Sequence, residues 1–311
     1  MEIGSWEFSV VVTRFAPSPT GYLHLGHVVN AIYVWGVARA LRGRVLLRIE
    51  DHDRIRSRTQ FESAILQDLD WLGFVADEGR EPVVRQSDHQ DIYQAALQQL
   101  RARHHVYACA CSRKEIHLRA RRFGGHEDEQ VTDERYDGFC RMRRLQEIPG
   151  RGTRVQIDGR PERFHDLLLG GREQRPSEEC GDILLRDRDG HWTYQFAVTI
   201  DDMRQGVTLV IRGADLLSST GRQIKLARML GRDRPPEFLH HPLIMKTPAE
   251  KLSKAAGDAG VRELRAAGVS APDVIGRAAA AVGLLDTPRP LDAGEVPTLF
   301  QGIVSRRTYS P

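Results

Sequence analysis

The chain has 311 residues, of which 41% are hydrophobic and 28% charged, a profile that excludes a disordered or fibrous protein and predicts one or two globular domains. No stretch approaches the roughly 20 consecutive apolar residues of a membrane-spanning helix, and the first residues resemble a short strand rather than a signal peptide. We therefore expect a cytoplasmic protein without a membrane partner. The formal net charge of +3 does not by itself indicate a nucleic-acid partner, although it leaves room for a local basic patch.

The first hundred residues alternate between strand and helix patterns. An apolar, β-branched run over Phe8–Arg14 predicts a strand, which the turn sequence APSPTG follows. Apolar residues then recur at helical spacing from Val28 to Leu41, before a second predicted strand over Val45–Ile49. Further helices are predicted over about Phe61–Leu72 and Gln90–Arg103. This alternation indicates an α/β fold built on an open parallel sheet.

The middle of the chain interrupts the alternation. Residues Arg119–Arg154 are rich in charged residues and glycine and show weak periodicity, so we expect an irregular inserted module that is partly mobile. The β/α pattern returns with a predicted strand at Gly181–Arg186 and continues through Trp192–Ile200 and Val207–Ile211. The open sheet is therefore expected to resume after the insertion.

The C-terminal part is predicted to be mainly helical. A helix capped by Asp215 or Ser219 is expected to end near Gly231. From Ala255 onward the sequence is rich in alanine and has a helical pattern. The proline-rich segment 286–297, DTPRPLDAGEVP, is expected to be a poorly ordered tail.

Residues 14–27, RFAPSPTGYLHLGH, carry the strongest chemical signal and fall at a predicted strand-to-helix junction. A helix start presents unpaired backbone N–H groups and the positive end of the helix dipole, which favour a phosphate. Gly26 allows a flat ring to approach the backbone, and His24 and His27 add donors for phosphate oxygens that gain charge in a transition state. The alternative is a capped helix start with two exposed histidines, but the preceding strand and P-S-P-T-G sequence favour a phosphate site.

Lysine is scarce in this chain and is concentrated in one segment. Only five of the 45 basic residues are lysines, and three of these, Lys246, Lys251 and Lys254, lie close together. A compact ammonium on a flexible stem suits a loop that closes over a triphosphate. A lysine pair is more often part of a solvated surface. Combined with the histidine motif, however, the sequence KLSK predicts that Lys251, Ser253 and Lys254 bind ATP.

Several blocks of sequence together resemble the glutamyl branch of the class I aminoacyl-tRNA synthetases. They are RFAPSPTGYLHLGH, RIEDHDRIRS, TYQFAVTIDD and GVTLVIRGADLLSSTGRQ, in this order, followed by KLSK, and the resemblance covers most of residues 8–255. It implies an ATP-dependent ligase with a Rossmann-like parallel-sheet catalytic domain, an inserted zinc-containing module and a short helical C-terminal part. ATP would be used with Mg²⁺.

The resemblance also implies how the chain divides. Residues 1–108 and 181–240 would form a split catalytic domain, and residues 109–180 an inserted module that binds zinc and the acceptor RNA. Residues 241–311 would hold the KLSK loop and a helical C-terminal region with a flexible tail. Too few residues follow Lys254 for the anticodon-binding domain of full-length glutamyl-tRNA synthetases, so none is expected.

Its length and the sequence RGADL at Arg212–Leu216 most resemble the shorter glutamyl-queuosine tRNA(Asp) synthetases. The implied reaction activates L-glutamate with ATP and transfers it to the queuosine base in the anticodon loop of tRNA(Asp). We expect a monomer. The alternatives are a truncated or atypical glutamyl-tRNA synthetase that charges a tRNA 3′ end, and an inactive paralogue that only binds tRNA. The intact histidine and lysine motifs oppose the latter, although Ala255 stands where synthetases often carry a polar residue.

The cysteine spacing predicts a metal site rather than disulfides, because four cysteines are too few for a disulfide framework at this length. Three grouped thiolates and one further ligand form a closed tetrahedral zinc site, for which chemistry alone nominates His117 or His126. Three buried free thiols are the plain alternative. The family pattern C-x-C…Y-x-x-x-C instead implies one structural Zn²⁺ on Cys109, Cys111, Tyr136 and Cys140.

A pocket for L-glutamate needs cations for two carboxylates and an anion for one ammonium. Arg212, at the end of an apolar strand, suits a bidentate carboxylate contact, and Arg14 is a second cation. Glu50 is placed to hold the ammonium and Tyr194 to supply a hydroxyl. Each residue alone would be an ordinary strand-end side chain. The family's glutamate-binding positions map onto Arg14, Phe15, Ala16, Pro17, Ser18, Glu50, Tyr194 and Arg212.

Overall fold

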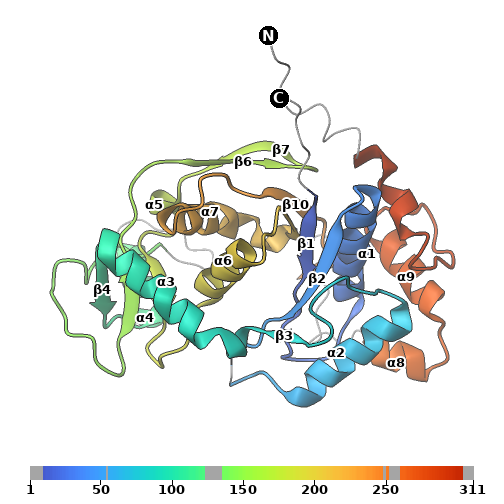
Figure 1. Ribbon diagram of the computed structural model, residues 1–311, viewed down its shortest axis with the longest axis horizontal. Helices are drawn as coiled ribbons and strands as arrows, with labels where there is room; N and C mark the ends of the chain where they lie inside the picture. Colours follow the sequence, from blue (N-terminus) through green and yellow to red (C-terminus); the bar gives the residue numbers. More distant parts are fainter. Residues whose placement is uncertain (1–9, 54, 123–134, 248–249, 252–259, 304–311) are drawn as a thin grey trace, which may run out of the picture.

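A parallel sheet lies at the centre of the computed structural model, which describes residues 10–53, 55–122, 135–247, 250–251 and 260–303. Strand β1 (Val12–Phe15) pairs in parallel with β2 (Arg44–Ile49), and β2 pairs in parallel with β3 (Val84–Arg85) (Figure 1). β2 is buried along nearly its whole length, as expected for a parallel strand that is covered on both faces.

A second set of strands continues the sheet beyond β1. This set consists of β9 (Leu209–Gly213), β10 (Glu237–His241), β6 (Glu162–Asp166) and β7 (Gly170–Gln174). β9, β10 and β6 are parallel neighbours, and β7 is antiparallel to β6. β9 lies beside β1, where the Thr208 backbone N–H donates to the Val12 carbonyl at 2.9 Å. The strand order therefore reverses between β1 and β9, and such a switch point is where open α/β sheets bind ligands.

Helix α1 (Leu25–Ala40) connects β1 to β2 and is buried along most of its length. It is apolar on nearly all sides because the sheet covers one face and the C-terminal segment covers another. Gly36 is required in its interior, since an added Cβ would lie 2.2 Å from the Phe300 ring. The next helix, α2 (Thr59–Leu72), ends at Gly73, whose φ of 80° is typical of a helix C-terminus.

The C-terminal segment packs against α1 and α2 (Figure 1). It contains α8 (Val261–Ala266), α9 (Ala271–Ala281) and the 3₁₀ helix η4 (Val296–Phe300). Leu291 and Val296 are fully buried in the main core. The expectation of a poorly ordered tail over 286–297 is therefore wrong. The prolines prevent a long helix there, but the apolar residues between them are still buried, with Leu291 bonded to Pro272 of α9 and Val296 beside Gly36 of α1.

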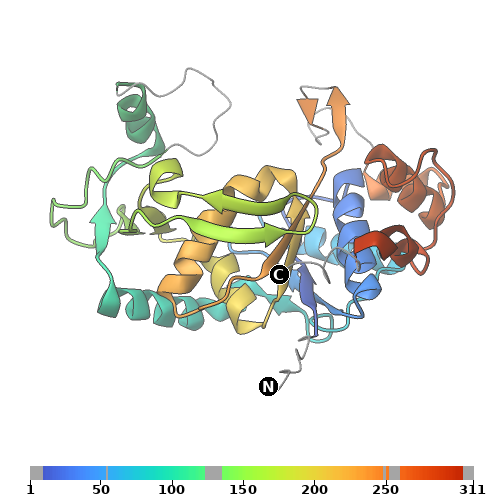
Figure 2. The same ribbon diagram turned by 90° about the horizontal axis from the view of Figure 1, so that it is seen from above.

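A separate antiparallel sheet lies at the end of the molecule opposite the C-terminal helices (Figure 2). It follows α3 (Gln90–Arg103), and β5 is its middle strand. Its strands are β4 (Val106–Cys109), β5 (Gly152–Val155) and β8 (Ile183–Arg186). Helix α4 (Arg113–Arg122) extends from this sheet. A second hydrophobic core, which includes Trp192 and Phe196, joins the sheet to α3.

Residues 109–180, which the sequence predicts to be an inserted module, include two strands of the central sheet. β6 and β7 fall within these residues, yet β6 pairs with β10 and β7 pairs with β6, so both belong to the central sheet, where Phe164 contacts Phe238 with ring centroids 5.2 Å apart. The remaining short helices are η1 (Gln86–His89), α5 (Pro176–Glu179) and η2 (Ala214–Ser219).

The segment Trp192–Ile200 is mainly helical, because Thr193 caps helix α6 (Tyr194–Arg204) by accepting the Phe196 N–H. Helix α7 (Thr220–Met229) begins after Ser219, which forms no side-chain cap. None of the helices in the described ranges combines the length and apolar character needed to cross a bilayer.

Candidate active site

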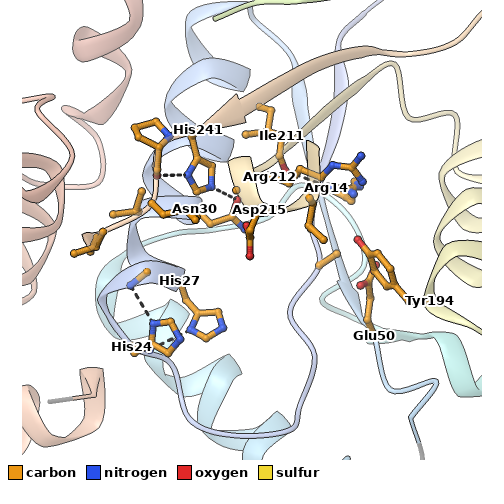
Figure 3. A pocket seen from close by; sticks show the side chains of 18 residues that line it. Arg14, His24, His27, Asn30, Glu50, Tyr194, Ile211, Arg212, Asp215 and His241 are labelled. Carbon is orange, nitrogen blue, oxygen red and sulfur yellow. Dashed lines mark hydrogen bonds between the residues drawn. The ribbon is translucent and has the colours of Figure 1, made fainter. Parts of the chain in front are cut away.

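A cavity of about 580 Å³, here called the first cavity, opens at the carboxyl ends of β1, β2, β9 and β10 (Figure 3). Helix α1 contributes one wall, and η2 and the residues after β10 contribute others. The cavity brings together residues from five separated stretches of the sequence. Its polar and predicted lining residues are Arg14, Ala16, His24, Gly26, His27, Asn30, Glu50, Tyr194, Arg212, Asp215 and His241.

His24 and His27 form the start of α1. The Gly26 backbone N–H donates to His24 Nδ1 at 3.1 Å, and the His24 backbone N–H donates to His27 Nδ1 at 3.2 Å. Because both Nδ1 atoms accept, the proton of each neutral imidazole lies on Nε2, which makes Nε2 a donor. A Cβ at Gly26 would lie 2.9 Å from the His24 ring, so the histidine cap alone accounts for this glycine. The approach of a ligand ring, which the sequence predicts, is not needed to explain it.

The chain flanking the predicted lysine loop lies beside the same helix start. β11 (Met245–Thr247) directly follows residues that line the cavity and pairs antiparallel with β12 (Glu250–Lys251). On the other side of the loop, Gly260 forms a β-bridge with His24. The chain therefore leaves the cavity lining at Ile244 and returns beside His24 at Gly260. The predicted residues Ser253 and Lys254 lie outside the described residues.

Buried ion pairs form the opposite end of the cavity. Arg14 Nε donates to Asp202 at 3.0 Å, and Arg48 Nη2 lies 2.9 Å from both Asp202 and Glu50. All four side chains are buried. Burial opposes ionisation of Asp202, but the two guanidiniums outweigh this effect and hold its pKa below the ordinary value. Glu50 lines the cavity and is held by Arg48, and Arg14 already has a carboxylate partner in Asp202.

Arg212 differs from Arg14 because its hydrogen-bond partners are neutral. Its Nε donates to His240 Nε2 at 3.1 Å, its Nη1 to Gln223 Oε1 at 2.6 Å and its Nη2 to Thr220 Oγ1 at 2.9 Å. The residue is only 3% exposed, and burial lowers the pKa of its guanidinium. Within the described ranges, no carboxylate accepts a hydrogen bond from it. Arg212 is therefore the group in the cavity best prepared for an incoming carboxylate.

Tyr194, the first residue of α6, lies near Glu50 in the cavity (Figure 3). Burial raises the pKa of its phenol, so the group remains a neutral hydroxyl. The predicted residues around Ala16 behave differently from one another. Ala16 lines the cavity, whereas Phe15 packs in the core against Trp35, with ring centroids 5.2 Å apart. The described lining does not include Phe15, Pro17 or Ser18.

Three polar lining residues lie outside the predicted set of site residues. His241 Nε2 lies 3.1 Å from Asn30 Oδ1, and the His241 ring stacks on Tyr33. Asn30 follows His27 by three residues on α1, so helical spacing was a usable signal for it. The sequence HHP after an apolar strand was a signal for His241, whereas Asp215 was predicted only as a helix cap.

The predicted zinc residues come together on the antiparallel sheet. The Sγ atoms of Cys109, Cys111 and Cys140 lie within 4.8 Å of one another. Tyr136 Oη lies 3.4 Å from Cys109 Sγ and accepts the Cys140 backbone N–H at 2.8 Å. Sulfur ligands of a tetrahedral zinc lie about 3.8 Å apart, so this donor set fits one zinc ion. Arg119 Nη2, 3.3 Å from Cys111 Sγ, is placed to balance thiolate charge.

A second cavity of about 580 Å³ lies between α4, β8, α6 and α7. Tyr194 lines this cavity as well as the first. His117 also lines it and is not part of the cysteine group, and the other histidine alternative, His126, lies outside the described residues. Asp182 is the acidic side chain in its described lining, and its carboxylate is paired with Arg141 at 2.9 Å. The cationic lining residues are Arg113, Lys114, Arg154 and Arg222.

Comparison with known proteins identifies the family. The family model for the catalytic domain of class I tRNA synthetases (E and Q) matches residues 10–272. The chain is 39% identical to the glutamyl-Q tRNA(Asp) synthetase of Symbiobacterium thermophilum, over 92% of this chain and 91% of that protein. It is 38% identical to glutamate–tRNA ligase 1 of Syntrophus aciditrophicus, over 80% of this chain but only 51% of that protein.

A solved structure shows the same fold. The glutamate tRNA ligase of Elizabethkingia meningosepticum, crystallised in complex with its amino acid, matches with a TM-score of 0.73 and 28% identity. The match covers 93% of this chain and 64% of the ligase, so the chain spans less than two thirds of that structure. These similarities and the geometry of the first cavity agree. The chain belongs to the class I glutamyl- and glutaminyl-tRNA synthetase family of ligases, and within it to the glutamyl-Q tRNA(Asp) synthetases.

Proposed function

We propose that this protein, acting as a monomer, activates L-glutamate with ATP and transfers the glutamyl group to the queuosine base of tRNA(Asp). The observation that carries the proposal is the buried Arg212 guanidinium, whose described hydrogen-bond partners are all neutral. It lies in one cavity with a helix start suited to phosphate groups. A carboxylate and a nucleotide therefore have complementary sites in the same cavity.

In the first step, an oxygen of the glutamate α-carboxylate attacks the α-phosphorus of ATP. The phosphorus–oxygen bond to pyrophosphate breaks, and pyrophosphate leaves with the bonding electron pair. A carboxylate is already ionised at neutral pH, so this step needs no general base. The protein contributes position and charge stabilisation. In this proposal the α1 start with His24 and His27 supports the phosphates, Lys251, Ser253 and Lys254 bind them, and Mg²⁺ accompanies ATP as part of the substrate.

Glutamate is held at the opposite end of the cavity. Arg212 binds one carboxylate through its two terminal nitrogens. Glu50 accepts hydrogen bonds from the ammonium, since it lines the cavity and Arg48 holds its carboxylate in place. The Tyr194 hydroxyl forms part of the wall between them. This arrangement selects an amino acid with an acidic side chain, because an uncharged side chain would leave the buried cation without a counter-charge.

In the second step, a hydroxyl oxygen of the acceptor attacks the acyl carbon of glutamyl-adenylate. The bond from this carbon to the phosphate oxygen breaks, AMP leaves with the bonding electron pair, and the hydroxyl proton is released. The second cavity supports an RNA acceptor, because its cationic lining suits a phosphate backbone and it shares Tyr194 with the first cavity. Support for queuosine as the acceptor comes from the relatives named glutamyl-Q tRNA(Asp) synthetase, which match over nearly their full length.

We also propose one structural zinc ion in the inserted module. Cys109, Cys111, Cys140 and Tyr136 would hold it, and its contribution would be to stabilise the fold of this module. Zinc takes no part in the two chemical steps, because the cysteine group is not among the described lining of the first cavity.

Two assays test the proposed function. Glutamate-dependent exchange of pyrophosphate into ATP measures the first step, and its absence in the purified, zinc-loaded protein would favour an inactive tRNA-binding paralogue. Transfer of radiolabelled glutamate to tRNA(Asp) prepared with and without queuosine measures the second step. We expect transfer only to the queuosine-containing tRNA. Equal charging of both preparations would favour the second candidate, a glutamate–tRNA ligase, which the 38% identity to such an enzyme supports.

A further inference from the structure

We infer that Asp166 and His240 are positioning residues, which fix the orientation in which Arg212 meets the substrate carboxylate. The inference rests on the proposed function only for the nature of that ligand. The three side chains come from neighbouring parallel strands, in the order β6, β10, β9. Arg212 and His240 are direct cross-strand partners. The series runs from a buried carboxylate, through an imidazole, to the guanidinium at the cavity.

The contacts along this series are short and excluded from water. Asp166 Oδ2 lies 2.6 Å from His240 Nδ1, and His240 Nε2 lies 3.1 Å from Arg212 Nε. The exposed fractions of Asp166, His240 and Arg212 are 0%, 2% and 3%. Asp166 is itself held by backbone N–H groups, since its Oδ1 accepts those of Leu168 and Leu169, both at 2.9 Å. The carboxylate is therefore held in one position, and it orients the imidazole ring.

The chemistry of the contacts determines the tautomer of His240. Arg212 Nε can only donate, so His240 Nε2 must be the acceptor and carry no proton. The ring proton then lies on Nδ1, where it is donated to Asp166. Burial lowers the pKa of His240, which keeps the ring neutral. Burial opposes ionisation of Asp166, but the hydrogen bonds from His240, Leu169 and Leu168 together hold its pKa below the ordinary value. With the opposite tautomer, two N–H groups would face each other across 3.1 Å.

The remaining nitrogens of Arg212 are positioned as well. Gln223 accepts from Nη1 and Thr220 accepts from Nη2, so each of the three nitrogens has one bond to a buried group. A guanidinium has five N–H donors, and three are used in this way. The N–H groups not used by His240, Gln223 and Thr220 lie on the two terminal nitrogens, where the neutral Tyr194 hydroxyl also bonds Arg212. These are the donors available to a substrate carboxylate.

The variant Asp166→Asn tests the inference because it keeps the size of the side chain and changes one hydrogen-bonding atom. If the amide oxygen keeps the Leu168 and Leu169 N–H groups, its NH₂ replaces the oxygen that accepts both the His240 backbone N–H at 3.1 Å and the ring proton. The NH₂ then faces Nδ1 and forces the ring proton onto Nε2. Arg212 must then turn away. In glutamate-dependent pyrophosphate exchange we expect the KM for glutamate to rise roughly 10- to 100-fold, while the KM for ATP changes less than about twofold. Asp68→Asn, which alters a similarly buried carboxylate on α2 that lines neither cavity, is the matched control and should leave both constants unchanged.

A second variant and a spectroscopic measurement separate positioning from folding. His240→Gln retains one donor and one acceptor and should recover part of the glutamate affinity that His240→Ala loses. Nitrogen-15 NMR of labelled histidine should show a protonated Nδ1 and an unprotonated Nε2 at His240, and the reverse in Asp166→Asn. The opposite tautomer in the unsubstituted protein would overturn the inference, as would an unchanged KM for glutamate in folded Asp166→Asn. If the expected tautomer is found but glutamate supports no exchange, the positioning series stands and the proposed substrate is wrong.

Discussion

Two arginines at the first cavity show how the partner that a charged side chain has within the protein determines whether it can bind a ligand. Arg14 and Arg212 both follow apolar strands and resemble each other in the sequence. In the folded chain Arg14 is bonded to Asp202, whereas the described partners of Arg212 are neutral. Sequence patterns cannot distinguish these cases, because the partner carboxylate lies almost two hundred residues away. The two residues should therefore respond differently to substitution.

For Arg212→Ala we expect glutamate-dependent pyrophosphate exchange to fall by roughly 100-fold or more, since a buried, charge-assisted contact to the substrate is removed. The fold should be retained, because the three partners left behind are neutral. Arg212→Lys is the matched comparison and should also be impaired, as an ammonium cannot form the bidentate contact. Unchanged glutamate activation in either folded variant would refute the carboxylate assignment.

Asp202 provides a prediction about stability and pH. Its pKa is lowered in the folded state, so its ion pairs stabilise the fold above the ordinary aspartate pKa, and this contribution is lost as the pH falls through the lowered value. At pH 7, Asp202→Asn should lower the free energy of unfolding by about 3 kcal/mol or more, because two buried guanidiniums lose their common partner. Denaturant titrations should show this difference shrinking in acid. Asp70→Asn removes an exposed pair with Arg80 and should cost less than about 1 kcal/mol.

At the scale of helices and strands, the sequence predicts elements with strong local patterns. Helix α3 was expected over the residues it occupies, and α2 differs by only two residues at its start. β6 and β7 have polar sequences and were not predicted, because the place of β6 depends on pairing with β10, about seventy residues further on, and that of β7 on pairing with β6. The proline-rich segment 286–297 was expected to be disordered for a related reason. Composition does not show that α1 presents an apolar face for Leu291 and Val296.

The inserted module allows the proposed metal site to be tested separately from the active site. The purified protein should contain one zinc per chain, and Cys109→Ser should lose both the zinc and the stability of this module. Metal analysis and limited proteolysis of β4, β5 and α4 measure these effects. Cys180→Ser is the matched control, since Cys180 is not part of the cysteine group and should retain zinc. Full metal content in Cys109→Ser would show that the ligand set is wrong.

At the scale of the whole molecule, the sequence blocks correctly predict the family, and the fold explains why they lie far apart in the chain. Each block ends a strand or begins a helix at the same edge of one parallel sheet. The overall balance of charge, by contrast, gives no information about the RNA. Whether basic residues gather at one place is a property of the fold, as the lining of the second cavity shows.

The second cavity leads to a prediction about the acceptor RNA. The double variant Arg113→Ala and Lys114→Ala should weaken RNA binding and reduce its dependence on salt, because fewer counterions are released. Glutamate-dependent pyrophosphate exchange should be unaffected, as neither residue lines the first cavity. The matched control is Arg160→Ala with Arg163→Ala, two exposed arginines remote in sequence from α4. Equal effects of the two double variants on the KM for tRNA would argue against a role for the second cavity.

Tyr194 lines both cavities, so a single phenol ring is a wall of each. Under the proposed function, the activated glutamyl group and its acceptor would react next to this ring, and neither group would have to move to a distant site. The glutamyl-adenylate, which is a reactive mixed anhydride, would then stay bound until the RNA arrives. Such an enzyme is expected to keep its intermediate bound between the two steps, and its overall rate would be set by the arrival and departure of tRNA.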